Sequence, residues 1–541
     1  MLKANSGFTR RHFLKTTIAA AGVAALPLRG IAAWSPAKYT RYNVMSAGGK
    51  KALASYAKGV QAMLNLPADH PQNWFRNVFI HLMDCPHGNW WFYVWHRGYL
   101  GYFEQTIRNL SEDSTFAMPY WDWTTLPQIP DSMFDGVLTP QHRGFEPYTS
   151  NLAVFTSFIQ PALTSYWNSL NAAQRAQLNT RGYANFKSLW NDVTGNGVSG
   201  NMAYANTCGS RYLTRDNPKL DEKTAYDVSP FVVYSGLLPT DFNNPVSYLS
   251  FTSSKTPSHN TQPGGPNSFF SVLEGFPHNK THNYIGGYGP LDPGPYGNMT
   301  NNLSPVDPIF FLHHSNMDRL WDVWTRKQKN LHLPYLPAGQ DLATFSNEPF
   351  LFYVNGKGDY VGASHAGDYL STDRFDYTYE PGFGEKVVEV PNPGLMAKHT
   401  TPALKGLLKG NTASVAVPTA AIRKHLGDAL LPSLIAEITL PRPSGTSSAR
   451  EFDVIVGAPA GVTQVDADSP YYAGTIAFFG NMAHMHRMPL DATFAVPLPK
   501  APQAFHNLGA AANASVNIRV VPSHPHGEKP PLLKAVSVRA L

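Results

Sequence analysis

Apolar residues spaced three and four positions apart predict buried helices in two parts of the chain. One helix is expected from Trp74 to about His81, and the next carries an apolar stripe. That stripe reads Trp91, Trp95, Tyr99, Tyr102 and Phe103. In the second part, Phe310, Phe311, Leu320, Trp321 and Trp324 recur at helical spacing, and Ser304-Pro305 is the expected helix start. A helical pattern from Tyr39 to Leu64 is expected to pack against these helices.

The C-terminal part of the chain has strand composition instead. Residues 452–456, 474–479 and 512–521 are rich in strand-forming residues and are separated by turns. Pro391 to Gly394 indicates a linker before them, and residues 125–270 form a long excursion of turns and short helices. The expected fold class is therefore a mainly helical core with long loops over residues 34–390, followed by a β-rich C-terminal domain over 391–541.

Histidines occur at positions in these helices that suit a metal site. His278 and His282 are four residues apart, which places both on one face of a helix. The adjacent His313 and His314 diverge by about 100°, so we expect one to be a ligand and the other a packing residue. Upstream, His81 ends one helix, His87 lies in a Pro-His-Gly loop and His96 lies on the next helix.

Two neutral imidazoles that converge are a common way to hold a transition metal, so two such trios predict a two-metal site. For an isolated pair of this kind, surface histidines are the competing interpretation. A zinc protease is a poor fit, because Asn279 stands where that motif requires glutamate.

Several segments together resemble one known family. WHRGYLGYFE, the PYWDW of Pro119 to Trp123, HNKTHNYIGG and DPIFFLHHSNMDRLW are similar to tyrosinases, catechol oxidases and molluscan haemocyanins, over roughly Arg41 to Glu380. The resemblance implies a four-helix bundle that holds two copper ions as a dinuclear type 3 site. It assigns His81, His87 and His96 to the first copper and His278, His282 and His314 to the second, with His313 as the neighbour.

The resemblance also implies roles for residues around the second copper. Glu274 and Asn279 match a pair that orients a water able to take the proton of a phenol, although an ordinary carboxylate and amide at a helix start is the alternative. Phe310 is expected to stack near the substrate ring, or to serve core packing. Asn283 replaces the basic residue of some relatives, so no strong preference for carboxylate-bearing substrates is expected.

Cys85 and Cys208 are the two cysteines, too few for a disulfide framework. Because Cys85 stands two residues before His87, the resemblance implies a Cys85–His87 thioether. A Cys85–Cys208 disulfide and two free thiols are the alternatives. The sequence Met482 to Met488 is rich in Met and His, and it is either a transient copper-loading site or a loop packed on the core.

The N-terminus changes the charge balance. The net charge is +6, but Lys3, Arg10, Arg11, Lys15 and Arg29 supply five of those positive charges, which leaves +1 for the rest. Nucleic acid binding therefore has no electrostatic support. Residues 1–33 match a twin-arginine export signal, which predicts the twin-arginine export machinery as a partner and a periplasmic or secreted location. No membrane span is expected.

The function that these observations favour is a tyrosinase-like polyphenol oxidase. It would use O2 to hydroxylate phenolic small molecules at the ortho carbon and oxidise o-diphenols to o-quinones. A catechol oxidase or o-aminophenol oxidase without the first activity is the close alternative, and a haemocyanin-like oxygen carrier is a more distant one. The C-terminal domain is expected to shield the site and keep the chain latent, with one apolar side chain in the pocket. An oligomer is possible.

Overall fold

The computed structural model describes residues 37–194, 211–261, 268–287, 297–389, 402–427, 433–443, 449–480, 491–505, 508, 511–524 and 529–540. Lys38–Leu541 forms one compact unit. The expected export signal, Cys208, the linker at Pro391 to Gly394 and the Met/His cluster at 482–488 lie outside the described residues.

Four helices carry or flank the histidines, as predicted. They are α2 (Trp74–Asp84), α3 (Phe92–Ser111), α11 (Asn279–Gly286) and α12 (Ile309–Asn330). The first of them starts at Asn73, whose side chain accepts hydrogen bonds from the backbone N–H groups of Phe75 and Arg76. Aromatic rings fill the space between helices: Phe103 of α3 stacks on Phe311 of α12, and Trp74 packs edge-on against both.

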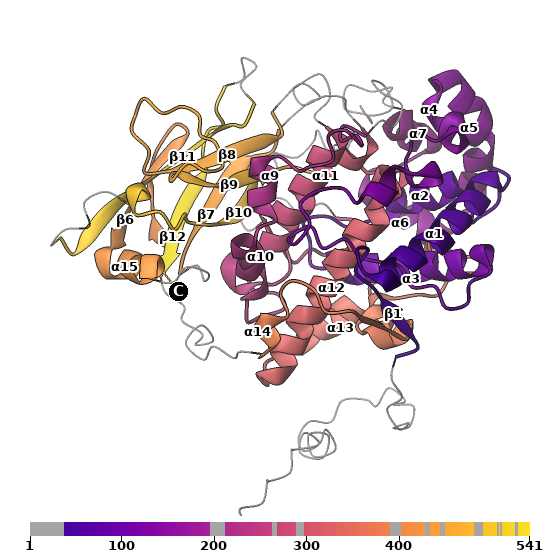
Figure 1. The fold of residues 1–541 in the computed structure, drawn as a ribbon, viewed down its shortest axis with the longest axis horizontal. Coiled ribbons are helices and arrows are strands. Elements are labelled where there is room, and N and C mark those ends of the chain that lie inside the picture. The colour runs from indigo at the N-terminus through magenta and orange to yellow at the C-terminus, as the bar shows by residue number, and fades with distance from the viewer. Residues whose placement is uncertain are drawn as a thin grey trace, which may run out of the picture. The chain divides into compact units, whose positions relative to one another are not determined.

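Most of the remaining helices lie around these four in the ribbon of Figure 1, whereas α15 lies in the β-rich part. They are α1 (Ala47–Asn65), α4 (Glu146–Thr149), α5 (Leu152–Ser169), α6 (Ala172–Arg181), α7 (Phe186–Thr194), α9 (Glu222–Asp227), α10 (Pro230–Leu237), α13 (Gln340–Ser346), α14 (Lys386–Glu389) and α15 (Thr419–Gly427). None of the described helices combines the length and apolar character needed to cross a bilayer.

The expected helix from Tyr39 is wrong at its start. Residues Tyr39–Arg41 form strand β1, which pairs in parallel with β3 (Tyr377–Tyr379). The helix begins only after Ser46, whose side chain accepts from the Gly49 N–H. The strand places the buried Arg41 guanidinium 2.9 Å from Glu104 and 3.1 Å from Asp318.

The expected start of α12 at Ser304-Pro305 is also wrong. Residues Ser304–Val306 form a single 3-10 turn, and α12 begins at Ile309. Asp307, which precedes Pro308, is extended with φ −82° and ψ 118°. A residue before proline disfavours the helical conformation, which explains the interruption.

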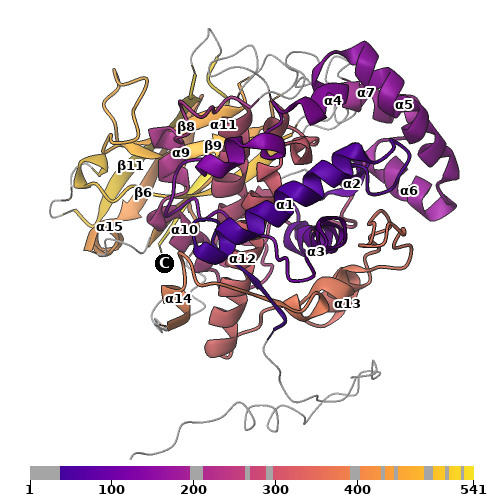
Figure 2. The ribbon, with the colours of Figure 1, turned by 45° about the vertical axis from the view of Figure 1, so that its right-hand side comes forward.

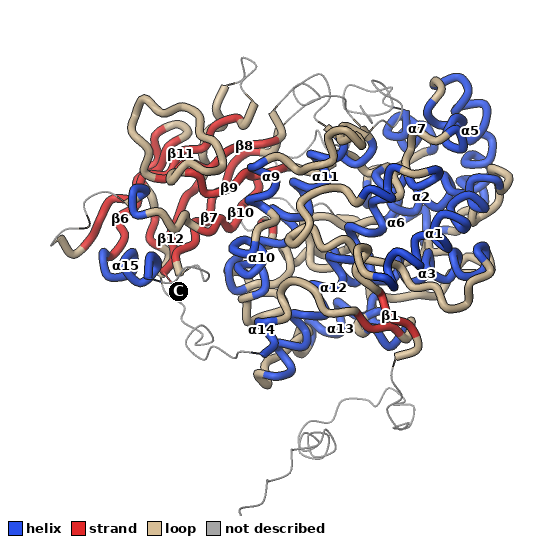
Figure 3. The backbone as a smooth tube through the Cα atoms, viewed as in Figure 1, coloured by secondary structure: helices blue, strands red, loops and turns tan. Residues whose placement is uncertain are grey.

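The C-terminal strands form two five-stranded sheets, drawn red in Figure 3. One has the order β2-β10-β7-β12-β4, with bounds Phe269–Phe270, Asp491–Pro497, Leu434–Pro441, Ala535–Ala540 and Leu404–Lys405. The other has the order β5-β6-β11-β8-β9, with bounds Leu407–Lys409, Thr412–Pro418, Asn513–Pro522, Glu451–Val456 and Tyr472–Ala477. The strands predicted from composition correspond to β8, β9 and β11.

The helical and β-rich parts share elements and contacts. Strand β2 comes from the helical part of the sequence, yet it pairs in parallel with β10 through Phe269–Thr493 and Phe270–Phe494. Helices α9 and α11 lie beside the β-rich part in both ribbon views (Figures 1 and 2). Lys223 binds Asp453 of β8 at 2.6 Å, and Lys280 of α11 forms a buried ion pair with Glu451 of the same strand.

Candidate metal centre

Two groups of largely buried side chains bring possible metal-binding atoms together, each group's atoms lying within 4.8 Å of one another. The first group is His81, Cys85, His87 and His96. The second is His278, His282, His313 and His314. All six histidines predicted as ligands therefore fall in these groups.

In the first group, backbone carbonyls orient two of the rings. His81 Nδ1 lies 2.8 Å from the Asn302 carbonyl oxygen, and His96 Nδ1 lies 2.7 Å from that of Phe92. A ring that donates through Nδ1 keeps the lone pair of Nε2 for a metal. His87 comes from the loop between α2 and α3, as predicted, where Gly88 adopts a left-handed φ of 68°.

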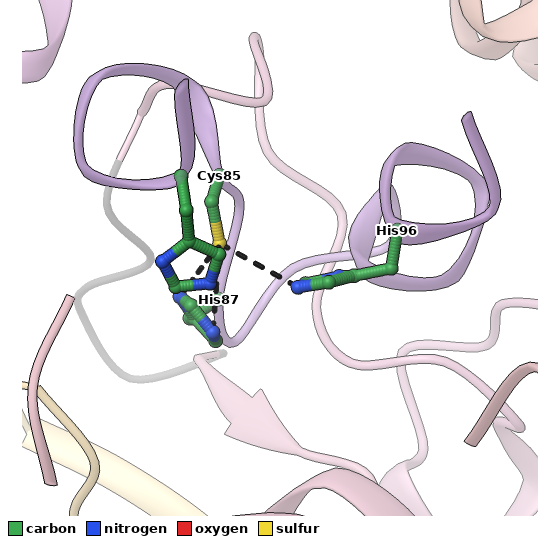
Figure 4. Close-up of side chains that lie close together, drawn as sticks. Cys85, His87 and His96 are labelled. Atoms are coloured by element: carbon green, nitrogen blue, oxygen red, sulfur yellow. Dashed lines mark hydrogen bonds between the residues drawn. The ribbon is translucent and has the colours of Figure 1, made fainter. Parts of the chain in front are cut away.

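Cys85 points into the middle of this group (Figure 4). Its Sγ lies 3.0 Å from His81 Nε2, 3.7 Å from His96 Nε2 and 3.3 and 3.6 Å from the two ring nitrogens of His87. Burial raises the pKa of the thiol well above its ordinary value. Cys85 is a free thiol in the structure.

In the second group, His278 and His282 lie side by side, with ring centroids 4.5 Å apart. His278 ends a π-helical turn, Glu274–His278, that contains Pro277, and α11 follows directly. Such turns often mark functional sites. The Nδ1 of His278 lies 2.9 Å from Asn279 Oδ1, and that of His282 lies 2.7 Å from the Met299 carbonyl oxygen.

His313 and His314 point in different directions, as adjacent helical residues must, and their ring planes are 83° apart. His314 Nε2 lies 3.1 Å from His282 Nε2, while its ring stacks on His96 of the first group at 4.1 Å. His313 instead accepts a 3.2 Å hydrogen bond at Nδ1 from the indole of Trp123, in the PYWDW segment. His314 thus lies between the two groups, and His313 at their edge.

Burial keeps these imidazoles neutral. It lowers the pKa of His81 and of His278 to about 3. It lowers the pKa values of His87, His96, His282, His313 and His314 well below the ordinary value, with repulsion from neighbouring histidines adding to the effect. Neutral imidazole is the form that binds metals. The buried Nε2 atom of His278 has no hydrogen-bond partner among the described residues, although a buried polar atom ordinarily has one.

Glu274 connects the second group to the loop of the first. Its carboxylate accepts a 2.5 Å hydrogen bond from the Gly88 N–H and another from the Ser253 hydroxyl. Burial raises the pKa of Glu274 to about 8, although these two bonds and the Arg442 charge act in the opposite direction. Asn279 donates through Nδ2 to the Ala477 carbonyl oxygen at 2.8 Å.

Three phenylalanine rings contact the histidines. Phe310, the predicted one, is 4.2 Å from His314 and 5.0 Å from His81 between ring centroids. Phe92 is 4.6 Å from His96 and 4.8 Å from His278. Its position one helical turn before His96 is a signal that sequence reasoning missed. The third is Phe479, two residues beyond the end of β9 (Tyr472–Ala477), at 4.4 Å from His282 and 4.8 Å from His87.

Comparison with known proteins adds to this geometry. Residues 60–327 match the family model described as the common central domain of tyrosinase. The chain is 24% identical over 349 residues to a chloroplastic polyphenol oxidase II of Ipomoea batatas, covering 61% of this chain and 48% of the relative. It is 27% identical over 304 residues to a tyrosinase of Hahella sp. (strain CCB-MM4), covering 55% of this chain and 48% of the relative. The chain thus spans about half the length of the curated relatives it matches.

Solved structures show the likeness of the fold. A latent aurone synthase (polyphenol oxidase) aligns with a TM-score of 0.55 at 18% identity, over 93% of this chain and 90% of that one. A functional unit from octopus hemocyanin aligns with a TM-score of 0.51 at 15% identity, over 93% of this chain and 100% of the hemocyanin unit. At these identities the likeness shows the fold alone. The tyrosinase match contains all the histidines of both groups, and through that central domain the chain belongs to the tyrosinase and polyphenol oxidase family.

Proposed function

We propose that the protein is a type 3 copper phenol oxidase that uses O2 to hydroxylate monophenols at the ortho carbon and to oxidise o-diphenols to o-quinones. The observation that carries the proposal is the pair of histidine groups facing each other. Four of the rings bind a protein oxygen through Nδ1, so that Nε2 is free for a metal.

The residues fit two copper ions. His81, His87 and His96 would hold the first, and His278, His282 and His314 the second. The unpartnered, buried Nε2 of His278 supports this assignment, because a ligand would satisfy it. His314 is preferred to His313 because it faces both groups, whereas Trp123 binds His313. When bound, the copper ions supply the binding of O2 and the exchange of electrons with the phenol.

The protein's own part is to position and deprotonate the phenol. A phenol has a pKa of about 10 and is neutral near pH 7. Burial raises the pKa of Glu274 to about 8, so its deprotonated form is a stronger base than an ordinary glutamate and, together with Asn279 and an oriented water, can accept the phenol proton as the pH approaches 8. The rings of Phe310 and Phe92 beside the histidines exclude water from the site.

Cys85 and His87 are proposed to form a thioether. The Sγ atom approaches both nitrogens that flank the Cε1 carbon of His87. A covalent bond there would reduce the conformational freedom of a ligand that no helix carries. Forming it replaces the S–H bond of Cys85 and the Cε1–H bond of His87 with one S–C bond and releases two protons and two electrons, which O2 can accept as it is reduced to H2O2. The intact chain would then be two hydrogen atoms lighter by mass spectrometry.

The chain is proposed to be latent. Phe479 packs beside His87, His278 and His282, where a substrate ring would otherwise approach. The polar groups next to the site are also occupied: Asn279 donates to the Ala477 carbonyl, and Asn283 donates to Glu451 and to the Phe478 carbonyl. Displacement of residues 477–479 together with Glu451 would free the pocket and both amides.

Oxygen uptake by the copper-loaded chain tests the proposal. We expect slow uptake by the intact chain with a monophenol or a catechol, and faster uptake with both after mild detergent or protease treatment. Uptake with catechol alone would restrict the function to catechol oxidation. Reversible oxygen binding without turnover would indicate a carrier, and fewer than two bound coppers per chain would contradict the metal assignment. Export by the twin-arginine route stays a prediction from the sequence.

A further inference from the structure

The loop of residues 85–91 carries His87, and no helix fixes its conformation. Several of its hydrogen bonds go instead to residues far along the chain. The Trp90 N–H donates to the Ser254 carbonyl at 3.0 Å, and Asn89 Nδ2 donates to the His259 carbonyl at 3.1 Å. The segment 254–260, which belongs to the long excursion after α3, therefore holds the second half of this loop.

The same segment also holds the beginning of the loop, through the side chain of His259. His259 Nε2 lies 2.9 Å from Asp84 Oδ1, and its Nδ1 lies 2.5 Å from Glu348 Oε1. Asp84 is the last residue of α2 and immediately precedes Cys85. Its second oxygen accepts the indole N–H of Trp95 on α3 at 2.8 Å, so Asp84 joins the two helices on either side of the loop.

The two carboxylates beside His259 favour its cationic form. The ring is fully buried, and each nitrogen lies within hydrogen-bond distance of a carboxylate that can only accept, which favours hydrogen on both nitrogens; the Asn260 amide nitrogen also lies 2.9 Å from Nε2. Burial alone would lower the pKa of His259, but the charges and hydrogen bonds of Asp84 and Glu348 outweigh it and raise the pKa to about 9. A buried charge of this kind is favourable only while its partners remain in place.

Asn260 extends the contact to a second cation. Its Oδ1 accepts from Arg181 Nη1 at 3.2 Å, and Arg181 also donates to the carbonyls of Leu82 and Cys85, at 2.8 Å each. The carbonyls at the end of α2 are thus bound by a buried guanidinium, while His259 binds the carboxylate beside them.

We propose that His259, held between Asp84 and Glu348, is a positioning residue that fixes the loop bearing His87 and thereby sets the affinity of the first metal site. It acts through Asp84 and the loop backbone and touches none of the metal-binding histidines. The inference rests on the proposed function, since it assumes that His81, His87 and His96 hold copper. Loss of such outer contacts ordinarily weakens metal binding by about 10- to 100-fold.

The test is copper binding by the full-length His259→Gln variant. Glutamine is uncharged and cannot donate to both carboxylates as the imidazolium does. We expect the first site to lose affinity by about 10- to 100-fold while the second keeps its own. At limiting copper the variant would then hold about one ion per chain, and this lone Cu(II) would be visible by electron paramagnetic resonance. The spectrum of His87→Ala gives the reference for an empty first site.

Two further variants make the result specific. Glu348→Gln keeps an oxygen acceptor for His259 and removes only the charge, so it should give a smaller loss at the same site even if His259→Gln does not fold. Lys327→Met is the matched control, because it removes another buried basic side chain. Burial lowers the pKa of Lys327 to about 7, and its amine binds the carbonyls of Leu237, Leu238 and Pro239 at the end of α10. We expect it to lower thermal stability and leave both copper affinities unchanged.

Unchanged binding of both coppers by His259→Gln and Glu348→Gln would overturn the proposal. So would an equal loss at both sites, because it would indicate a general loss of stability. Failure of the proposed function has a different signature: the unmodified chain would itself bind fewer than two coppers.

Discussion

The ring of Phe479 lies 4.4 Å from the ring of His282, between centroids, although 197 residues separate them in the sequence. Phe479 lies two residues beyond the end of β9, and His282 lies in the middle of α11. The contact places a side chain of the β-rich part directly against the candidate metal centre. Under the proposed latency, Phe479 is our candidate for the apolar residue that the sequence predicted without naming.

Replacing Phe479 with alanine should raise the activity of the intact chain. The substitution removes the ring beside His87 and His282 without cutting the chain, so a phenol ring can enter. We expect a rise of about tenfold or more in oxygen uptake with catechol, which corresponds to about 1.4 kcal/mol. Phe478→Ala is the control, because that neighbouring ring packs against Phe452 and Phe494 within the β-rich part. It should lower stability by about 3 kcal/mol without this gain.

Glu451→Gln should loosen the attachment of the β-rich part. It removes the charge that binds Lys280, a fully buried ammonium on α11 whose pKa rises to about 12 because Glu451 and nearby carboxylates outweigh the effect of burial. Breaking a buried pair costs about 3–5 kcal/mol, so activation should need less detergent. Glu385→Gln disrupts the Arg326 pair inside the helical part and should not shift the detergent midpoint. The prediction would be contradicted if Glu451→Gln and Glu385→Gln were activated at the same detergent concentration.

Separate alanine variants should distinguish His313 from His314. His314→Ala removes a ring that faces both groups, and we expect the copper content to fall below two per chain. His313→Ala removes a ring bound by Trp123, and the chain should keep two coppers with some loss of stability. Elemental analysis after equilibrium dialysis measures this. The opposite result would exchange the two assignments.

Stability should fall as the pH rises from about 6.5 to about 9, through His259. Its pKa in the folded chain, about 9, exceeds the ordinary value of 6.5. The stabilisation by Asp84 and Glu348 is therefore complete below pH 6.5 and is lost as the pH rises through 9. The difference of 2.5 units corresponds to about 3 kcal/mol. Denaturant unfolding at several pH values should show this dependence in the unmodified chain and a weaker one in His259→Gln. The prediction would be contradicted if the free energy of unfolding changed with pH to the same extent in the unmodified chain and in His259→Gln.

The sequence predicted the parts of the centre that are local. The apolar stripe around His96, the His278–His282 spacing and the Pro-His-Gly loop each fix where a ring lies relative to its own helix, and the structure agrees. The divergence of His313 and His314 follows from helix geometry alone. The start of α12 was misplaced because the effect of Pro308 on Asp307 outweighed the helix-start signal at Ser304-Pro305.

Contacts between distant segments could not be predicted in this way. His259 lies in an excursion without clear periodicity, and its role depends on Asp84 and Glu348, which are 175 and 89 residues away. Phe479 lies just after β9, and the composition of that strand shows only that the strand is buried. In both cases the deciding information is which surfaces pack together, and residue patterns within one segment do not contain it.

Strand β2 has a consequence for how a latent chain could open. Its two residues are built into the C-terminal sheet through β10, and only three residues separate Phe270 from Glu274. Cutting the polypeptide between residues 389 and 402 would therefore leave the two fragments joined by this ladder and by the Lys280–Glu451 pair. Cleavage of the polypeptide and release of the β-rich part are thus distinct events. Separation of this sheet from the helical part would also displace β2, and with it the short segment that leads from β2 to His278. Exposure of the centre and a change in the position of its ligands would therefore be coupled.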